Sequence, residues 1–167
     1  AFYSFAYNLK IFIDEARAKG AHPILVTPTS RRRFDENGKS VNTHGDYPDA
    51  VRWVAAKENV PLIELNGMTA ILFNALGVDN STKAFVHYPA GTFPGQTRTL
   101  KDNTHFSTYG AYEVSKCVIE GMKKADLEIV KYLRPDYSGF DPAQPDSFES
   151  FKWNLGSFTE NEKPDGN

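Results

Sequence analysis

Residues 22–28 read His22-Pro23-Ile24-Leu25-Val26-Thr27-Pro28, which places three consecutive apolar side chains between two prolines. An apolar run this short and without alternation is typical of a strand buried on both faces, as in a parallel sheet. The segment before it predicts a helix, because apolar residues recur there at helical spacing and a glycine follows in the position of a C-terminal cap. These residues are Leu9, Phe12, Ile13, Ala16 and Gly20.

Downstream of this run, helical and strand-like segments alternate, which favours an α/β fold with helices packed on both sides of a parallel sheet. Residues 29–45 interrupt the alternation as a long polar loop with an Asn37-Gly38 turn. Natural sheets have about 4–6 strands, so two or three strands make an incomplete sheet. We expect helices over 46–58, over 68–76 and from 108 onward, and strands over 24–26 and 60–65, with 84–88 either a strand or loop.

The composition excludes several classes of protein. With 167 residues and a formal net charge of -2, the chain has no general attraction for nucleic acid or anionic membranes. No apolar run approaches the roughly 20 residues that span a bilayer. The single cysteine, Cys117, rules out an internal disulfide and is expected to be buried and inert. We expect one domain part over 1–134 and an irregular C-terminal extension over 135–167.

Asp102 and His105 are the residues that point to chemistry, within Lys101-Asp102-Asn103-Thr104-His105-Phe106-Ser107. We expect this segment to be a loop directly before a helix. Histidine suits general-base catalysis near neutral pH, and a carboxylate on its far ring nitrogen fixes the tautomer and stabilises the imidazolium. An aspartate three residues earlier can reach that nitrogen. The pair alone is common by chance, so its sequence context decides what it means.

That context resembles the SGNH/GDSL hydrolases, in particular their rhamnogalacturonan acetylesterase branch. Residues 102–111 are similar to the last catalytic block of the family, in which an aspartate and a histidine complete a Ser-His-Asp triad. The resemblance implies a three-layer α/β/α fold with a parallel, flavodoxin-like sheet. It covers residues 3–130 and includes the helix Tyr7–Arg17, the strands Pro23–Pro28 and Pro61–Leu65, Tyr88-Pro89 and Phe93-Pro94-Gly95.

The Gly-Asp-Ser nucleophile motif and the Gly-x-Asn-Asp block of that family do not occur in the 167 residues. We therefore expect the C-terminal half of a serine esterase, a poor enzyme by itself because the nucleophile and oxyanion hole are missing. The resemblance implies that the whole protein removes O-acetyl groups from a pectin- or rhamnogalacturonan-type polysaccharide, is secreted or periplasmic, and needs no cofactor or metal. The incomplete sheet predicts association with the missing N-terminal half or with a second copy.

Two alternatives stay open at this point. One is a non-catalytic carbohydrate-binding or interaction module that keeps a relic Asp-x-x-His. The other is an esterase of the same family with a different acyl group or sugar.

The candidate substrate-binding residues are Arg31, Arg32, Arg33, His87 and Tyr88. Guanidinium groups bind the carboxylates of a galacturonate polymer in bidentate fashion, although a solvated loop is the plainer interpretation of the arginines.

Ser107 is expected to cap the following helix rather than act as a nucleophile. We expect His44 to anchor its loop. The four histidines lack the spacing of metal ligands.

Overall fold

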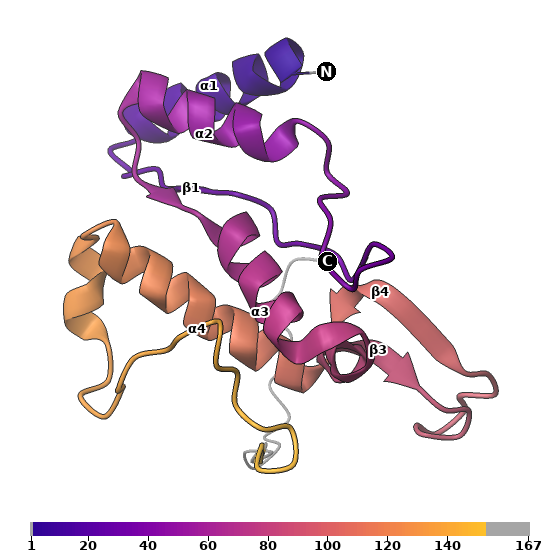
Figure 1. Cartoon of the computed structure of the whole chain (residues 1–167). Coiled ribbons are helices and arrows are strands. Elements are labelled where there is room, and N and C mark those ends of the chain that lie inside the picture. Colours follow the sequence, from indigo (N-terminus) through magenta and orange to yellow (C-terminus); the bar gives the residue numbers. More distant parts are fainter. Residues whose placement is uncertain (1, 153–167) are drawn as a thin grey trace.

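The computed structural model describes residues 2–152 and has a mixed α/β fold with two small sheets (Figure 1). In chain order its elements are α1 (Phe2–Ala18), β1 (Leu25–Val26), α2 (Tyr47–Glu58), β2 (Leu62–Ile63), α3 (Leu65–Asn80), the 3-10 helix η1 (Ser81–Ala84), β3 (Phe85–Tyr88), β4 (Leu100–Phe106), α4 (Thr108–Lys124) and the 3-10 helix η2 (Glu128–Tyr132). Within residues 2–152 no helix is both long and apolar enough to cross a membrane.

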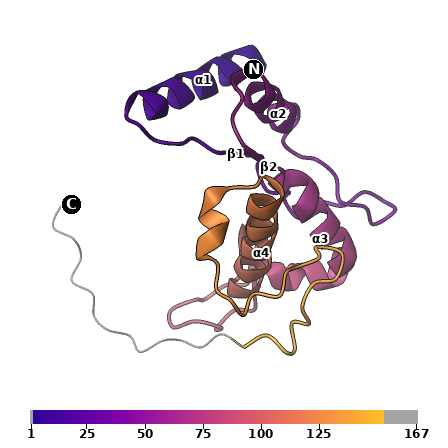
Figure 2. The ribbon, with the colours of Figure 1, turned by 90° about the vertical axis from the view of Figure 1, so that its left-hand side faces the viewer.

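β1 and β2 pair in parallel, with Leu25 opposite Leu62 and Val26 opposite Ile63. The two predicted strands are therefore present, although each is shorter than the apolar run that predicted it. α1 and α2 lie on one side of the pair, and α3 and α4 lie on the other (Figures 1 and 2).

Each side has its own apolar core. Ala6, Ile13, Val54 and Val60 are buried together between α1 and α2. The larger core joins β2, α3, β3 and α4, and its buried members are Ile63, Leu65, Leu72, Phe73, Ala84, Phe85, Tyr109, Val114, Cys117 and Leu127.

β1 is not buried on both faces, as its sequence predicted. Ile24 is 39% exposed and Val26 is 42% exposed. The physical reason is that strand side chains are buried by layers packed on the two faces of a sheet, and within residues 2–152 no layer fully covers Ile24 and Val26. The apolar run predicts that its side chains are covered on both faces, and residues 2–152 supply only part of that cover.

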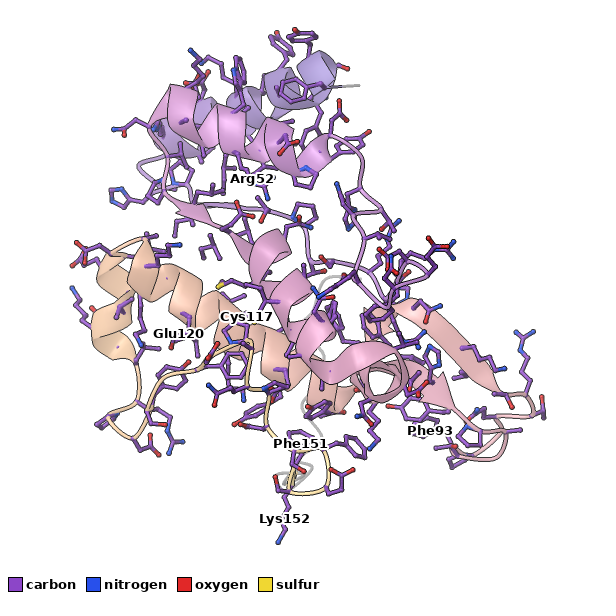
Figure 3. The ribbon with its side chains drawn as sticks, viewed as in Figure 1. Arg52, Phe93, Cys117, Glu120, Phe151 and Lys152 are labelled. Carbon is purple, nitrogen blue, oxygen red and sulfur yellow. The ribbon has the colours of Figure 1, made fainter. Side chains whose placement is uncertain are left out.

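Polar contacts join α2 to the strand pair. Arg52, labelled in Figure 3, donates two hydrogen bonds to the carboxylate of Glu64 at 2.6 and 2.7 Å and one to Asp49 at 2.6 Å. Oε1 of Glu64 also accepts a hydrogen bond from the hydroxyl of Thr27, just after β1, at 3.0 Å. Burial opposes ionisation of Glu64, but the hydrogen bonds from Arg52 and Thr27 outweigh it and lower the pKa.

α3 begins three residues earlier than expected, and its helical geometry breaks at Gly77, where we expected the helix to stop. Gly77 has φ 73° and ψ 177°, which are not helical values, and a second short helical segment follows it up to Asn80. Glycine adopts this left-handed φ without the steric cost that a Cβ would add.

The chain after η2 has no further helix or strand up to residue 152 and packs along α4 (Figure 3). Glu120 accepts hydrogen bonds from the Tyr137 hydroxyl at 2.9 Å and from the Phe140 amide at 3.1 Å. Lys116 lies 2.8 Å from the buried carboxylate of Glu113 and 2.7 Å from the exposed carboxylate of Asp146. The predicted extension over 135–167 is thus described up to residue 152, and residues 153–167 lie outside the described part.

Candidate active site

Asp102 and His105 lie on β4, which pairs antiparallel with β3 in a hairpin. The prediction that residues 101–107 form a loop is thus wrong, although the pairing of β4 with β3 is irregular here. Phe85 faces Phe106 and His87 faces Lys101, so residues 102–105 lie opposite the single residue Val86. This irregular β-bulge sets the four residues outside the regular ladder, and bulges commonly re-aim side chains beside functional sites.

The carboxylate of Asp102 closes the bulge by itself. Its Oδ1 accepts the backbone N–H groups of Thr104 at 2.6 Å and His105 at 2.9 Å, which is an Asx turn. Its Oδ2 lies 2.7 Å from Nδ1 of His105. The spacing of three residues therefore brings the carboxylate to the imidazole, as the sequence predicted.

The same contacts set the charge state of Asp102. The backbone N–H of His105 is the largest cause, followed by the imidazole of His105 and the backbone N–H of Thr104, and together they lower the pKa to about 2. Asp102 is therefore an anion at neutral pH and acts only as a hydrogen-bond acceptor. An acceptor on Nδ1 keeps the proton there and leaves Nε2 unprotonated in the neutral imidazole.

His105 presents that second nitrogen to solvent. Its side chain is 78% exposed and that of Asp102 is 37% exposed. Within residues 2–152, Nε2 makes no hydrogen bond, and no serine hydroxyl lies against it. The dyad can accept a proton from a group that approaches from outside the described residues.

The three arginines predicted to bind substrate do not form one cluster. Arg32 is committed to the protein: Nε donates to Ser81 Oγ at 3.0 Å, Nη2 to the Val78 carbonyl at 2.6 Å, and Nη1 to Asn103 Oδ1 at 3.1 Å. Arg31 and Arg33 are exposed, and their guanidinium groups form no ion pair or hydrogen bond within residues 2–152. The structure thus separates one anchoring arginine from two that remain available to a ligand.

His87 and Tyr88, the other two candidates, lie on β3. His87 Nε2 is 2.8 Å from Asn103 Oδ1, so this nitrogen contacts the bulge. Tyr88 packs edge-to-face on Phe93, in the loop that connects β3 to β4, with ring centroids 5.0 Å apart (Phe93 is labelled in Figure 3). Both residues are half-buried.

The backbone at the start of α4, which follows the bulge, lies very close to the backbone at Ala84. Ser107 is the N-cap of α4 as predicted: its Oγ accepts from the Gly110 amide at 3.1 Å and donates to the Lys83 carbonyl at 2.6 Å. The Ser107 amide donates to the Ala84 carbonyl at 3.1 Å. A Cβ on Gly110 would lie 1.9 Å from that same oxygen, so glycine is required there.

His44 anchors its loop, as expected, because Nε2 lies 2.8 Å from the Thr29 carbonyl oxygen.

Sequence reasoning missed two features of the site. One is Asn103, which sits between the two catalytic candidates and contacts both Arg32 and His87. The other is a shallow, open groove lined in part by Arg98, Lys101 and Asp102 itself. The sequence did not predict that Arg98 and Lys101 belong to the site, because their position near Asp102 depends on the pairing of β4 with β3.

No protein-family model matches the chain. Rhamnogalacturonan acetylesterase RhgT of Bacillus subtilis (strain 168) is 43% identical over 130 residues, which are 78% of this chain and 56% of RhgT. The probable rhamnogalacturonan acetylesterase YesY of the same organism is 35% identical over 125 residues, which are 75% of this chain and 53% of YesY. The chain thus spans about half the length of the curated relatives it matches.

A solved structure is also similar to this chain. The crystal structure of protein YxiM from Bacillus subtilis aligns with a TM-score of 0.62 and 22% identity, covering 77% of this chain and 33% of YxiM. At this identity the likeness shows a shared fold. The chain is therefore part of a mixed α/β fold known from a larger protein. More particularly, it is a homologue of proteins named rhamnogalacturonan acetylesterases, and the resemblance drawn from its sequence is confirmed.

Proposed function

We propose that this chain is part of a secreted or periplasmic serine esterase that removes O-acetyl groups from a pectin- or rhamnogalacturonan-type polysaccharide. The observation that carries the proposal is the Asp102–His105 pair, closed at 2.7 Å with the far nitrogen of the imidazole open to solvent. The names of the relatives supply the substrate class. The serine would come from outside these 167 residues, because no Gly-Asp-Ser motif occurs within them.

The roles follow from the chemistry of acyl transfer. A serine hydroxyl attacks the acetyl carbonyl while Nε2 of His105 takes its proton, and the imidazolium then gives that proton to the departing sugar oxygen, which leaves an acetyl-serine. Water then attacks the acetyl-serine with His105 again acting as the base, and acetate and the free serine are released. The ionised carboxylate of Asp102 holds the proton on Nδ1 and stabilises the imidazolium. None of these steps requires a cofactor.

The basic residues near the pair suit a polymer that carries carboxylates. Arg31 and Arg33 project from the loop that contacts the bulge, and Arg98 and Lys101 line the groove beside Asp102. We assign carboxylate binding to these residues and not to Arg32, whose nitrogens are already engaged. Replacing Arg31 and Arg33 together by serine should raise KM for the acidic polymer and leave KM for p-nitrophenyl acetate unchanged.

The proposal includes the completion of the fold. Within residues 2–152, β1 pairs with β2 on one edge and with no strand on the other, which supports pairing of the free edge with a strand of the missing part of a flavodoxin-like sheet, or with a second copy of this chain. Analytical ultracentrifugation of the 167-residue chain should show self-association or a co-purifying fragment. A stable monomer of this chain alone would contradict this part of the proposal.

The test of function is acetate release from acetylated rhamnogalacturonan by the complete protein and its variants. His105→Ala and Asp102→Asn should each lower kcat by about 10³-fold or more, because a triad works as a unit. His22→Ala is the matched control, since this exposed histidine before β1 should leave the rate unchanged.

The 167-residue chain alone should release no acetate above background. If it does, and if His105→Ala abolishes the release, the nucleophile lies either within this chain, which would make the external serine wrong, or in a co-purifying fragment that mass spectrometry would reveal. Binding of the polymer by the complete protein without any turnover would favour a carbohydrate-binding module instead.

A further inference from the structure

Asn103, the residue that follows Asp102 in the bulge, joins it to two distant segments of the chain. Its Oδ1 lies 2.8 Å from His87 Nε2 on β3 and accepts from Arg32 Nη1 at 3.1 Å. Its backbone carbonyl accepts the backbone N–H of Arg32 at 2.9 Å. These contacts span 16 residues to His87 and 71 to Arg32.

The side chain of Arg32, which contacts Asn103, is itself held in place by other hydrogen bonds. Its other donors bind the hydroxyl of Ser81, which is 0% exposed, and the carbonyl of Val78 at the end of α3. Its guanidinium carbon lies 5.8 Å from the ring centre of Phe34. An arginine held at both planar edges loses the rotamer freedom that such a side chain usually has.

The hydrogen bonds within residues 102–105 do not determine where the Asp102–His105 pair points, so contacts with other segments must do so. The hydrogen bonds of Asp102 define how the carboxylate and imidazole lie relative to each other, and all of them fall within four residues. They do not define how the pair lies relative to the rest of the protein. Three more residues on β4 than on β3 leave the ladder interrupted at this point, so regular strand pairing does not define it either.

We propose that Asn103 is a positioning residue, which through Arg32 and His87 fixes the direction in which the Asp102–His105 pair faces its substrate. The proposal rests on the proposed function, since the direction of Nε2 matters only if it takes a proton there. A displacement of about 1 Å at a reacting group costs about 100-fold in rate. Losing the exposed hydrogen bonds of Asn103 should therefore lower kcat much more than it lowers the free energy of unfolding.

The first test needs no catalysis. In the 167-residue chain, histidine side-chain NMR resolves four imidazoles, and backbone relaxation reports on residues 102–105. Asn103→Ala should alter the tautomer signature of His87 and increase motion in the bulge, while His105 keeps its Nδ1 proton because Asp102 is unchanged. Wild-type relaxation in the bulge and a wild-type His87 signature would overturn the proposal.

The second test uses the complete protein. Asn103→Ala should lower kcat for acetate release by about 10- to 100-fold with KM within about twofold of wild type. Asn103→Asp keeps an oxygen acceptor for both partners and should recover activity relative to Asn103→Ala. Arg32→Ala should give the same loss, and the double variant should be no worse than either single one, as expected for one unit.

Asn74→Ala is the matched control. Its Oδ1 accepts from the Ser40 amide at 2.7 Å, so the variant removes a tertiary hydrogen bond of the same kind away from the bulge. A kcat for Asn103→Ala equal to that of Asn74→Ala would overturn the positioning role. If the wild-type complete protein releases no acetate, the proposed function fails, and the NMR test still decides whether Asn103 holds the bulge.

Discussion

Replacing Gly110 by alanine should destabilise the protein, although alanine is normally the better residue in a helix. A Cβ at this position would lie 1.9 Å from the Ala84 oxygen and 2.7 Å from its carbonyl carbon. Both atoms belong to the backbone at the junction of η1 and β3, and they cannot rotate away as a side chain would.

The size of the effect follows from two opposing terms. Alanine for glycine within a helix contributes about 1 kcal/mol. Overpacking costs about 1–3 kcal/mol, and a clash with backbone belongs at the upper end of that range. We expect a net loss of about 2 kcal/mol in the free energy of unfolding, or a drop in Tm of about 4–8 °C for a chain of this size.

Gly67→Ala is the internal control for this measurement. Gly67 lies in the first turn of α3, and its Cβ would meet only Glu64 side-chain atoms at 3.8 and 3.9 Å. This variant should gain up to about 1 kcal/mol. Urea denaturation followed by circular dichroism compares the two, and a Gly110→Ala protein as stable as wild type would refute the argument.

Three further variants or measurements test the surroundings of the site. Ser107→Ala removes the acceptor for the Gly110 amide and should cost about 1 kcal/mol by urea denaturation; an unchanged midpoint would argue against the cap. Lys116→Met leaves the fully buried Glu113 without its ion-pair partner and should cost about 3 kcal/mol. Because burial raises the pKa of Glu113, the folded variant binds a proton that the unfolded chain releases, so its stability should increase as the pH falls from about 8 to about 5. A pH-independent deficit would contradict this account. Burial also raises the pKa of the Cys117 thiol to about 12, so Ellman's reagent at about pH 8 should label it only after denaturation; rapid labelling of the folded chain would show that the helix opens.

Local patterns of the sequence located most of the fold. The apolar stripe ending near Ala16, the prolines around residues 24–26 and the serine before α4 each act within one or two turns of chain, and the structure has α1, β1 and the N-cap of α4 at those places. Asp102 and His105 could be paired for the same reason, since the contact spans three residues.

The features that were missed depend on contacts over long sequence distances. Whether residues 102–105 form a loop or a bulged strand is decided by the pairing of β4 with β3. The three consecutive arginines look equivalent in the sequence, but only Arg32 reaches Ser81 and Asn103. Burial of Ile24 and Val26 requires a covering layer that no property of the run itself reveals.

The self-closed bulge has a consequence for how such a site is assembled during folding. The entropy lost on closing a contact grows with the length of the chain between its ends, and the carboxylate and imidazole are separated by only three residues. The Asp102–His105 contact can therefore form early in folding, as a local turn of the nascent chain, with little loss of chain entropy. Under the proposed function, the slower step of assembly would be the meeting of this pair with a nucleophile from outside the described residues.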